Sequence, residues 1–251
     1  LAGIDNSIKV YDLNNNVKIN YFNGHQSNVT SLSFVSSFDT IASVGLDNNM
    51  HYWLLNDTTQ KKAIKVIKNQ MVIIDKTISA TIPLSIGGNM LTMFLLGKSF
   101  FLKNYEVLNT LAISKDKKYL ATGGGGWRGI SSIAFPRSFP IYIYNNVTQK
   151  REFKLYGHYY KIKSLSFNHT GEFLASTAKN DQYLKIWNLK TKKLVDIYYC
   201  SYNFINSIEY NPVNDTLAIT NGLNVYLFDT KKDTAIILSQ GRAPLKFNND
   251  G

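Results

Sequence analysis

The chain has 251 residues, of which 44% are hydrophobic and 18% charged, a balance that excludes a disordered chain and suffices for a well-buried core. Its net charge of +11 permits contact with nucleic acid or acidic partners, but the lysines are scattered in ones and twos, which is typical of a solvated surface. The longest apolar stretch, residues 90–96, is too short for a membrane span of about 20 residues. We therefore expect a globular protein with no membrane span.

Cysteine usage indicates the compartment. Cys200 is the only cysteine, so no disulfide can form within the chain. This favours a reducing, intracellular location, either cytoplasmic or nuclear. The chain opens at Leu1 in a strand-like pattern without a signal peptide, and we expect it to be a fragment or a domain of a longer protein.

A short phrase of the type Leu-Ala-Ser recurs along the chain. Its copies begin at Leu1, Ile41, Leu120, Leu174 and Leu217, so that successive copies lie 40, 79, 54 and 43 positions apart. The spacing of 79 is nearly twice 40 and predicts one degenerate copy between Ile41 and Leu120. The spacing of 54 predicts an insertion of about fourteen residues after Leu120.

Runs of alternating apolar and polar residues, the period of a β-strand, flank each copy. One set precedes the phrase, at 29–34, 108–113, 162–167 and 205–210. Two sets follow it, at 8–11, 50–53, 141–144, 184–187 and 225–228, and more loosely at 17–22, 63–67, 152–156, 194–198 and 235–238. Four short strands in about forty residues form the unit of a β-propeller blade. The predicted fold class is therefore all-β.

Two of these units carry a specific pattern of polar residues. Gly24-His25 is followed by Ser43, Asp47 and Trp53, and Gly157-His158 is followed by Ser176, Asp181 and Trp187. The spacing from His to Trp is 28 positions in one unit and 29 in the other. Asp5 and Tyr11 keep the six-residue spacing of Asp47 and Trp53. In this pattern the sequence resembles the WD40-repeat β-propeller family.

The resemblance implies a structural role for these eight residues. In the family the His, Ser, Asp and Trp side chains form one hydrogen-bonded chain that holds a blade together, which is stable only if every member is paired. His25, Ser43 and Asp47 also have the residue types of a hydrolase triad. Because the same constellation recurs at His158, Ser176 and Asp181, we expect structural tetrads and no enzyme activity.

The pattern weakens elsewhere. Leu54 and Asn188 replace the Asp that usually follows the Trp, and residues 200–201 and 240–241 replace the usual Gly-His. Residues 68–105 carry no family residue, and a blade there is inferred from spacing alone. We expect a single propeller domain over 1–251, with blades at about 29–67, 71–105, 107–156, 162–198 and 205–238, and a partial blade of 1–22 plus 243–251. A closed ring of six blades and a truncated array of seven or more both fit this spacing.

The insertion at 123–140 is the candidate partner-binding segment. It offers Trp127, Arg128, Phe135, Arg137 and Phe139, residue types that dominate the energetics of protein interfaces. In the resembling family this connection opens on the usual partner-binding face. The alternative is a loop that folds these aromatic rings onto its own blade.

Other signals for chemistry are weak. The glycines at 123–126 lack the Gly-Lys-Ser/Thr ending of a phosphate loop. His51 and His169 are interpreted as solitary, no cluster has metal-ligand spacing, and Cys200 is interpreted as a packed thiol. We therefore predict no cofactor, no metal and no small-molecule substrate.

The sequence thus favours a non-enzymatic scaffold that mediates protein–protein interactions in an intracellular multiprotein complex. The alternative is a nucleic-acid or ribonucleoprotein-binding propeller subunit, which the net charge of +11 motivates.

Overall fold

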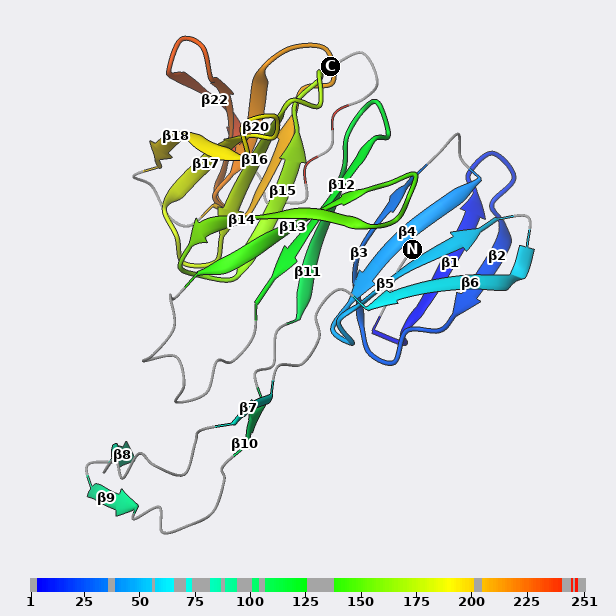
Figure 1. Cartoon of the computed structure of the whole chain (residues 1–251). Coiled ribbons are helices and arrows are strands. Elements are labelled where there is room, and N and C mark those ends of the chain that lie inside the picture. The colour runs from blue at the N-terminus through cyan, green and yellow to red at the C-terminus, as the bar shows by residue number, and fades with distance from the viewer. Residues whose placement is uncertain are drawn as a thin grey trace.

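A computed structural model of the chain is shown in Figure 1. It describes residues 4–35, 39–55, 57–65, 71–73, 82–86, 89–93, 101–103, 107–125, 138–200, 205–240, 245 and 247, and between 57 and 103 only the backbone of the strands. These residues form strands and turns, so the described part of the chain contains no apolar helix of membrane-crossing length.

Four antiparallel sheets of four strands each make up most of the structure. The first comprises β3 (Val29–Phe34), β4 (Thr40–Gly45), β5 (Asn49–Leu54) and β6 (Asp57–Lys65). The second comprises β11 (Leu108–Ile113), β12 (Tyr119–Gly124), β13 (Phe139–Asn145) and β14 (Arg151–His158). The third comprises β15 (Ile162–Phe167), β16 (Phe173–Ala178), β17 (Tyr183–Asn188) and β18 (Lys193–Tyr199). The fourth comprises β19 (Ser207–Tyr210), β20 (Thr216–Thr220), β21 (Asn224–Asp229) and β22 (Thr234–Gln240).

Three smaller sheets have two strands each. They pair β1 (Ser7–Asp12) with β2 (Val17–Asn23), β7 (Met71–Ile73) with β10 (Phe101–Lys103), and β8 (Ile82–Ile86) with β9 (Asn89–Met93). The β1–β2 sheet packs against the first four-stranded sheet, because Ile8 and Phe22 share a buried cluster with Ile41 and Trp53.

Burial follows the position of a strand within its sheet. In the third sheet, β16 and β17 are buried along almost their whole length, whereas most of β18 is exposed. The strands that open the four sheets, β3, β11, β15 and β19, lie next to one another in that order, and the sheets fan out around them (Figure 1). This radial arrangement of four-stranded sheets confirms the predicted all-β propeller fold.

The first and second sheets are in direct contact. The first and second sheets pack directly on each other, because Val44 and Met50 of one share a buried cluster with Leu108 and Leu120 of the other. The strands described between 71 and 103 pair as β7–β10 and β8–β9, not as one four-stranded sheet. Most of residues 71–105 lie outside the described part of the chain, so the expected blade there stays a prediction from the spacing.

The expected partial blade is seen at one end only. Its N-terminal part contains the β1–β2 hairpin, in which Ile8 pairs with Phe22. Of residues 243–251, only Leu245 and Phe247 are described, and neither lies in a strand. The rest of that segment lies outside the described residues, so closure of the ring by the two termini stays a proposal.

The shared core of the first two sheets provides a test. Leu108 is fully buried in this core, and Leu108→Ala should reduce the free energy of unfolding by about 2–5 kcal/mol, because it leaves a cavity between two sheets. Ile236→Ala, on the exposed strand β22, is the control and should change it by less than about 0.5 kcal/mol. Urea denaturation measures both. Equal, small losses would show that these sheets do not pack on each other.

Candidate functional site

The first polar tetrad links three segments of the β3–β6 sheet. His25 lies in the loop that leads into β3, Ser43 on β4, Asp47 in the turn after β4, and Trp53 on β5. The Trp53 indole N–H donates to Ser43 Oγ at 2.8 Å, and Ser43 Oγ lies 2.7 Å from His25 Nε2. His25 Nδ1 lies 2.9 Å from an oxygen of Asp47. Every member is bonded when Nδ1 carries the proton and Nε2 accepts from the serine hydroxyl.

The second tetrad repeats this geometry in the β15–β18 sheet. Trp187 Nε1 donates to Ser176 Oγ at 2.7 Å, Ser176 Oγ lies 2.7 Å from His158 Nε2, and His158 Nδ1 lies 3.1 Å from Asp181. The structure thus brings together all four members of each expected tetrad. Both serines are fully buried, with a partner on each side of the hydroxyl. Neither serine is open to a substrate as the nucleophile of a hydrolase would be.

In the two four-stranded sheets without a tetrad, the positions that correspond to Trp53 and Ser43 hold other residues. Leu120 of the second sheet pairs with Tyr144 where Ile41 of the first pairs with Trp53, and Leu111 pairs with Thr122 where Leu32 pairs with Ser43. In the fourth sheet the same two positions hold Phe228 and Ile219. Phe228 has no N–H to donate and Ile219 has no oxygen to accept. The fourth sheet therefore loses donor and acceptor together and leaves no indole N–H unpaired.

Burial and hydrogen bonding set the charges of the tetrads. Burial alone would raise the pKa of Asp47, but hydrogen bonds from His25 and from the backbone N–H groups of Gln26 and Asn49 outweigh it and lower the pKa to about 2. Burial lowers the pKa of His158, and the hydrogen bond to Asp181 offsets this only in part. The histidine is therefore held in the neutral form that the hydrogen-bonded chain requires.

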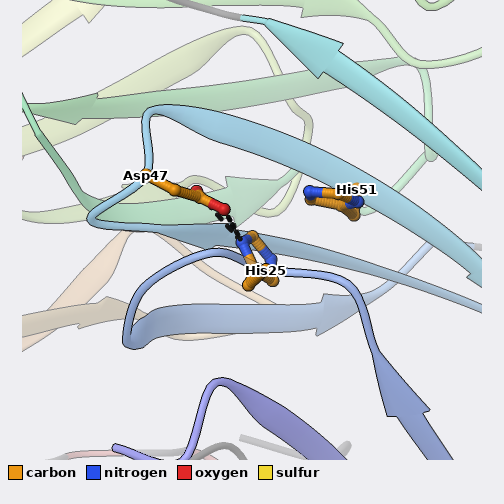
Figure 2. Close-up of side chains that lie close together, drawn as sticks. All are labelled: His25, Asp47 and His51. Carbon is orange, nitrogen blue, oxygen red and sulfur yellow. Dashed lines mark hydrogen bonds and ion pairs between the residues drawn. The ribbon is translucent and has the colours of Figure 1, made fainter.

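His51 lies beside the first tetrad and was not expected there. Figure 2 shows its ring on β5 close to His25, whose side chain meets Asp47. The ring centroids of His25 and His51 are 4.2 Å apart, and His51 also stacks on Trp53 at 5.2 Å. The interpretation of His51 as solitary was wrong, because the alternation of β5 places it on the same face as Trp53. His169 has a neighbour too, Asp215, at 3.1 Å.

The cluster of His25, Asp47 and His51 has the residue types of a metal site. One potential ligand atom from each lies within 4.8 Å of the others, and it is the one such group of three among the described residues. Both ring nitrogens of His25 already take part in the tetrad, and the Asp47 carboxylate also accepts from Gln26 and Asn49. A metal ion would have to displace bonds that hold the sheet together, so the cluster fits a structural role better.

A lysine or a histidine lies four residues after Asp5, Asp47 and Asp181. Lys9 Nζ lies 2.8 Å from Asp5, and Lys185 follows Asp181 at the same spacing in the third sheet. Lys185 Nζ donates to the backbone oxygen of Gly157 at 2.6 Å, next to His158. His51 occupies this position in the first sheet. The residue four positions after the turn aspartate is thus a lysine in two sheets and an imidazole in one.

The expected partner-binding residues are only partly described. Trp127, Arg128, Phe135 and Arg137 lie outside the described residues. Phe139, at the start of β13, is half-buried and packs against the core between the second and third sheets, so it contributes to the fold. Gly124 and Phe139, which border the segment, pair with Leu108 and His158, so the segment leaves the sheet at the end that carries the tetrads.

Cys200 lies at the end of β18, half-buried against the core of the fourth sheet. Burial raises the pKa of its thiol, which disfavours the reactive thiolate. This agrees with a packed thiol.

The two segments that contain the tetrads match a known family. The family model described as WD domain, G-beta repeat (WD40) covers residues 16–53 and 149–188, and each of these segments ends within a tetrad sheet. These two segments therefore match WD40 repeats, and the sheets have the arrangement of a β-propeller.

Among curated proteins, the chain is 23% identical over 193 residues to Elongator complex protein 2 of Saccharomyces cerevisiae. This match covers 69% of the chain and 24% of that protein, so the chain spans about a quarter of the length of this relative. Among solved structures, it resembles U3-55K with a TM-score of 0.60 at 16% identity, covering 94% of the chain and 56% of that structure. At this identity the structural likeness establishes the fold.

Removal of one donor tests the tetrad. Trp187→Phe keeps the ring but removes the indole N–H, and it should lower the free energy of unfolding by about 1–3 kcal/mol, because a buried hydrogen bond to Ser176 is lost. Phe153→Leu, which replaces a half-buried ring of β14 and removes no hydrogen bond of the tetrad, is the control. Chemical denaturation measures the free energy of unfolding of both variants. An unchanged value for Trp187→Phe would contradict a stabilising role of the indole hydrogen bond.

Acid should destabilise the tetrads in a defined order. Because the pKa of His158 is lowered on folding, the unfolded chain binds the proton more tightly, and stability falls as the pH drops below about 6.5. A further loss is expected below pH 3.8, towards 2, where Asp47 becomes protonated. Melting temperatures between pH 7.5 and 5 should fall less steeply for His158→Asn than for the unmodified chain. Parallel profiles would contradict this assignment.

Proposed function

We propose that the chain is a non-enzymatic scaffold that holds other proteins in an intracellular multiprotein complex. The observation that carries this proposal is the repeated, fully bonded tetrad. His25, Ser43 and Asp47 have the residue types of a hydrolase triad, but all three are already hydrogen-bonded within the tetrad that holds one sheet together. A rigid sheet that presents loops at one end is suited to binding a partner without reorganisation.

Similarity to a protein that is named as a member of a complex supports the proposed multiprotein assembly. Elongator complex protein 2 is by its name a member of a complex, and it is similar to this chain over 69% of the chain's length. An intracellular location, cytoplasmic or nuclear, agrees with a single cysteine that cannot form an internal disulfide.

We propose the segment at 126–137 as the partner-binding element. Phe139, which follows the segment on β13, pairs with His158 at the end of β14, so the described residues at this border lie beside the His158 loop. Trp127 and Arg128 offer a large ring and a forked hydrogen-bond donor, which are the side chains found most often at interface hot spots.

Affinity purification of the tagged chain tests this segment. Trp127→Ala with Arg128→Ala should lose the co-purifying proteins, because one true anchor contributes about 2 kcal/mol or more to affinity. The matched control is Val147→Ala with Lys150→Ala, in the β13–β14 turn at the opposite end of the same sheet, where Val147 is 84% exposed. The same proteins recovered with both double variants would exclude the segment as the binding element.

A further inference from the structure

Four exposed tyrosines gather at the tetrad end of the third sheet. Tyr159 and Tyr160 follow His158 in the loop before β15 and are 67% and 50% exposed. Tyr183 opens β17 and Tyr199 ends β18; they pair across the two strands, with ring centroids 5.6 Å apart. Tyr183 shares a face of β17 with Lys185, whose ammonium lies 6.0 Å from the Tyr159 ring. The two pairs of rings therefore belong to one surface.

Lysines lie between and beside these rings. Lys161 closes the tyrosine loop, and its backbone oxygen accepts from the N–H of Lys179 at 2.7 Å, so the two residues are neighbours. Lys163 follows on β15, with its ammonium bonded to Asn206. The carboxylate of the adjoining turn, Asp181, is already engaged by His158. The surface therefore combines exposed rings with positive charge that the tetrad carboxylate does not neutralise.

Two lysines next to these rings, Lys163 and Lys185, are partly removed from water. Burial lowers the pKa of Lys163, and the nearby charge of Lys179 lowers it further. Burial likewise lowers the pKa of Lys185, although Asp181 offsets part of the effect. A bound anion would stabilise the charged forms of both ammonium groups.

The first sheet shows that the fold does not require these residues. Its corresponding loop after His25 reads Gln26-Ser27-Asn28, and Leu46 N–H donates to the Asn28 oxygen at 3.0 Å as Lys179 does to Lys161. The same loop conformation and the same tetrad thus form without aromatic or cationic side chains. The tyrosines and lysines of the third sheet are therefore free to serve another role.

We propose that Tyr159, Tyr160, Lys161, Lys179, Tyr183 and Tyr199, the Tyr–Lys surface, bind single-stranded nucleic acid. Exposed tyrosine rings stack on bases of any sequence, and lysines beside them contact the phosphates. An acidic peptide would pair with the lysines but has no comparable group for four exposed rings. None of these six residues belongs to the proposed protein-binding segment, so each proposal is tested by its own variants.

Fluorescence anisotropy with labelled oligo(U) and oligo(dT) of about 20 nucleotides tests the proposal on the whole chain. The loop exchange Tyr159→Gln, Tyr160→Ser, Lys161→Asn installs the residues of the first sheet and should weaken binding at least about tenfold, the effect of one lost stacked base. Tyr159→Phe with Tyr160→Phe keeps the stacking rings and should retain the affinity. A melting curve for each variant verifies that the sheet is intact, and Lys179→Leu offers a second variant if the exchanged loop does not fold.

Salt dependence separates lysine–phosphate pairing from stacking. Lys179→Leu should reduce the slope of log affinity against log salt by about 0.7 for each phosphate that is no longer neutralised, whereas Tyr159→Phe with Tyr160→Phe should leave this slope unchanged. The control is Lys190→Gln with Lys193→Gln, which removes two positive charges at the opposite end of the same sheet, one more than Lys179→Leu. This variant should bind the oligonucleotides almost as tightly as the unmodified chain.

Preference between oligo(U) and oligo(dT) distinguishes RNA from DNA as the ligand, and binding of either supports the proposal. Absence of binding to both, equal affinity of the loop exchange, or competition by polyglutamate as strong as that by the oligonucleotides would overturn it.

Discussion

The structure depends on a hydrogen bond from a buried indole to a buried serine. Trp53 and Trp187 each donate to a hydroxyl that continues through an imidazole to a carboxylate in a turn. An unpaired member at this depth would cost about 1–3 kcal/mol, so the four residues are retained or lost as a unit. The fourth sheet illustrates the second outcome, with Phe228 and Ile219 in place of the indole and the hydroxyl.

The tetrads also determine where the chain can present binding groups. Each one ties the loop before the first strand of a sheet to the turn after its second strand, so both segments lie at one end of the sheet. The Tyr–Lys surface lies at this end of the third sheet, and Phe139, which follows the proposed protein-binding segment, pairs with His158 at the same end. The geometry that makes a rigid sheet therefore also makes a common edge on which different loops display different chemistry.

A lysine or histidine four residues after the turn aspartate is a second shared feature. Lys9, His51 and Lys185 occupy one position in three sheets, and their surroundings differ. Lys9 bonds Asp5 at the surface, Lys185 reaches a backbone oxygen, and His51 stacks on the tetrad tryptophan. The tetrad thus tolerates different cations or an imidazole beside it, because its own carboxylate is already satisfied by the histidine and by backbone N–H groups.

The sequence by itself determined the all-β class, the repeat of about forty residues and the members of both tetrads, because alternation and local spacing record strands and turns. Only the tertiary structure decided that the first sheet packs directly on the second, that His51 meets His25, and that four tyrosines share a surface with lysines. These contacts join residues from different strands, loops and sheets. Their formation depends on which faces meet in space, and a pattern read along one chain does not contain that information.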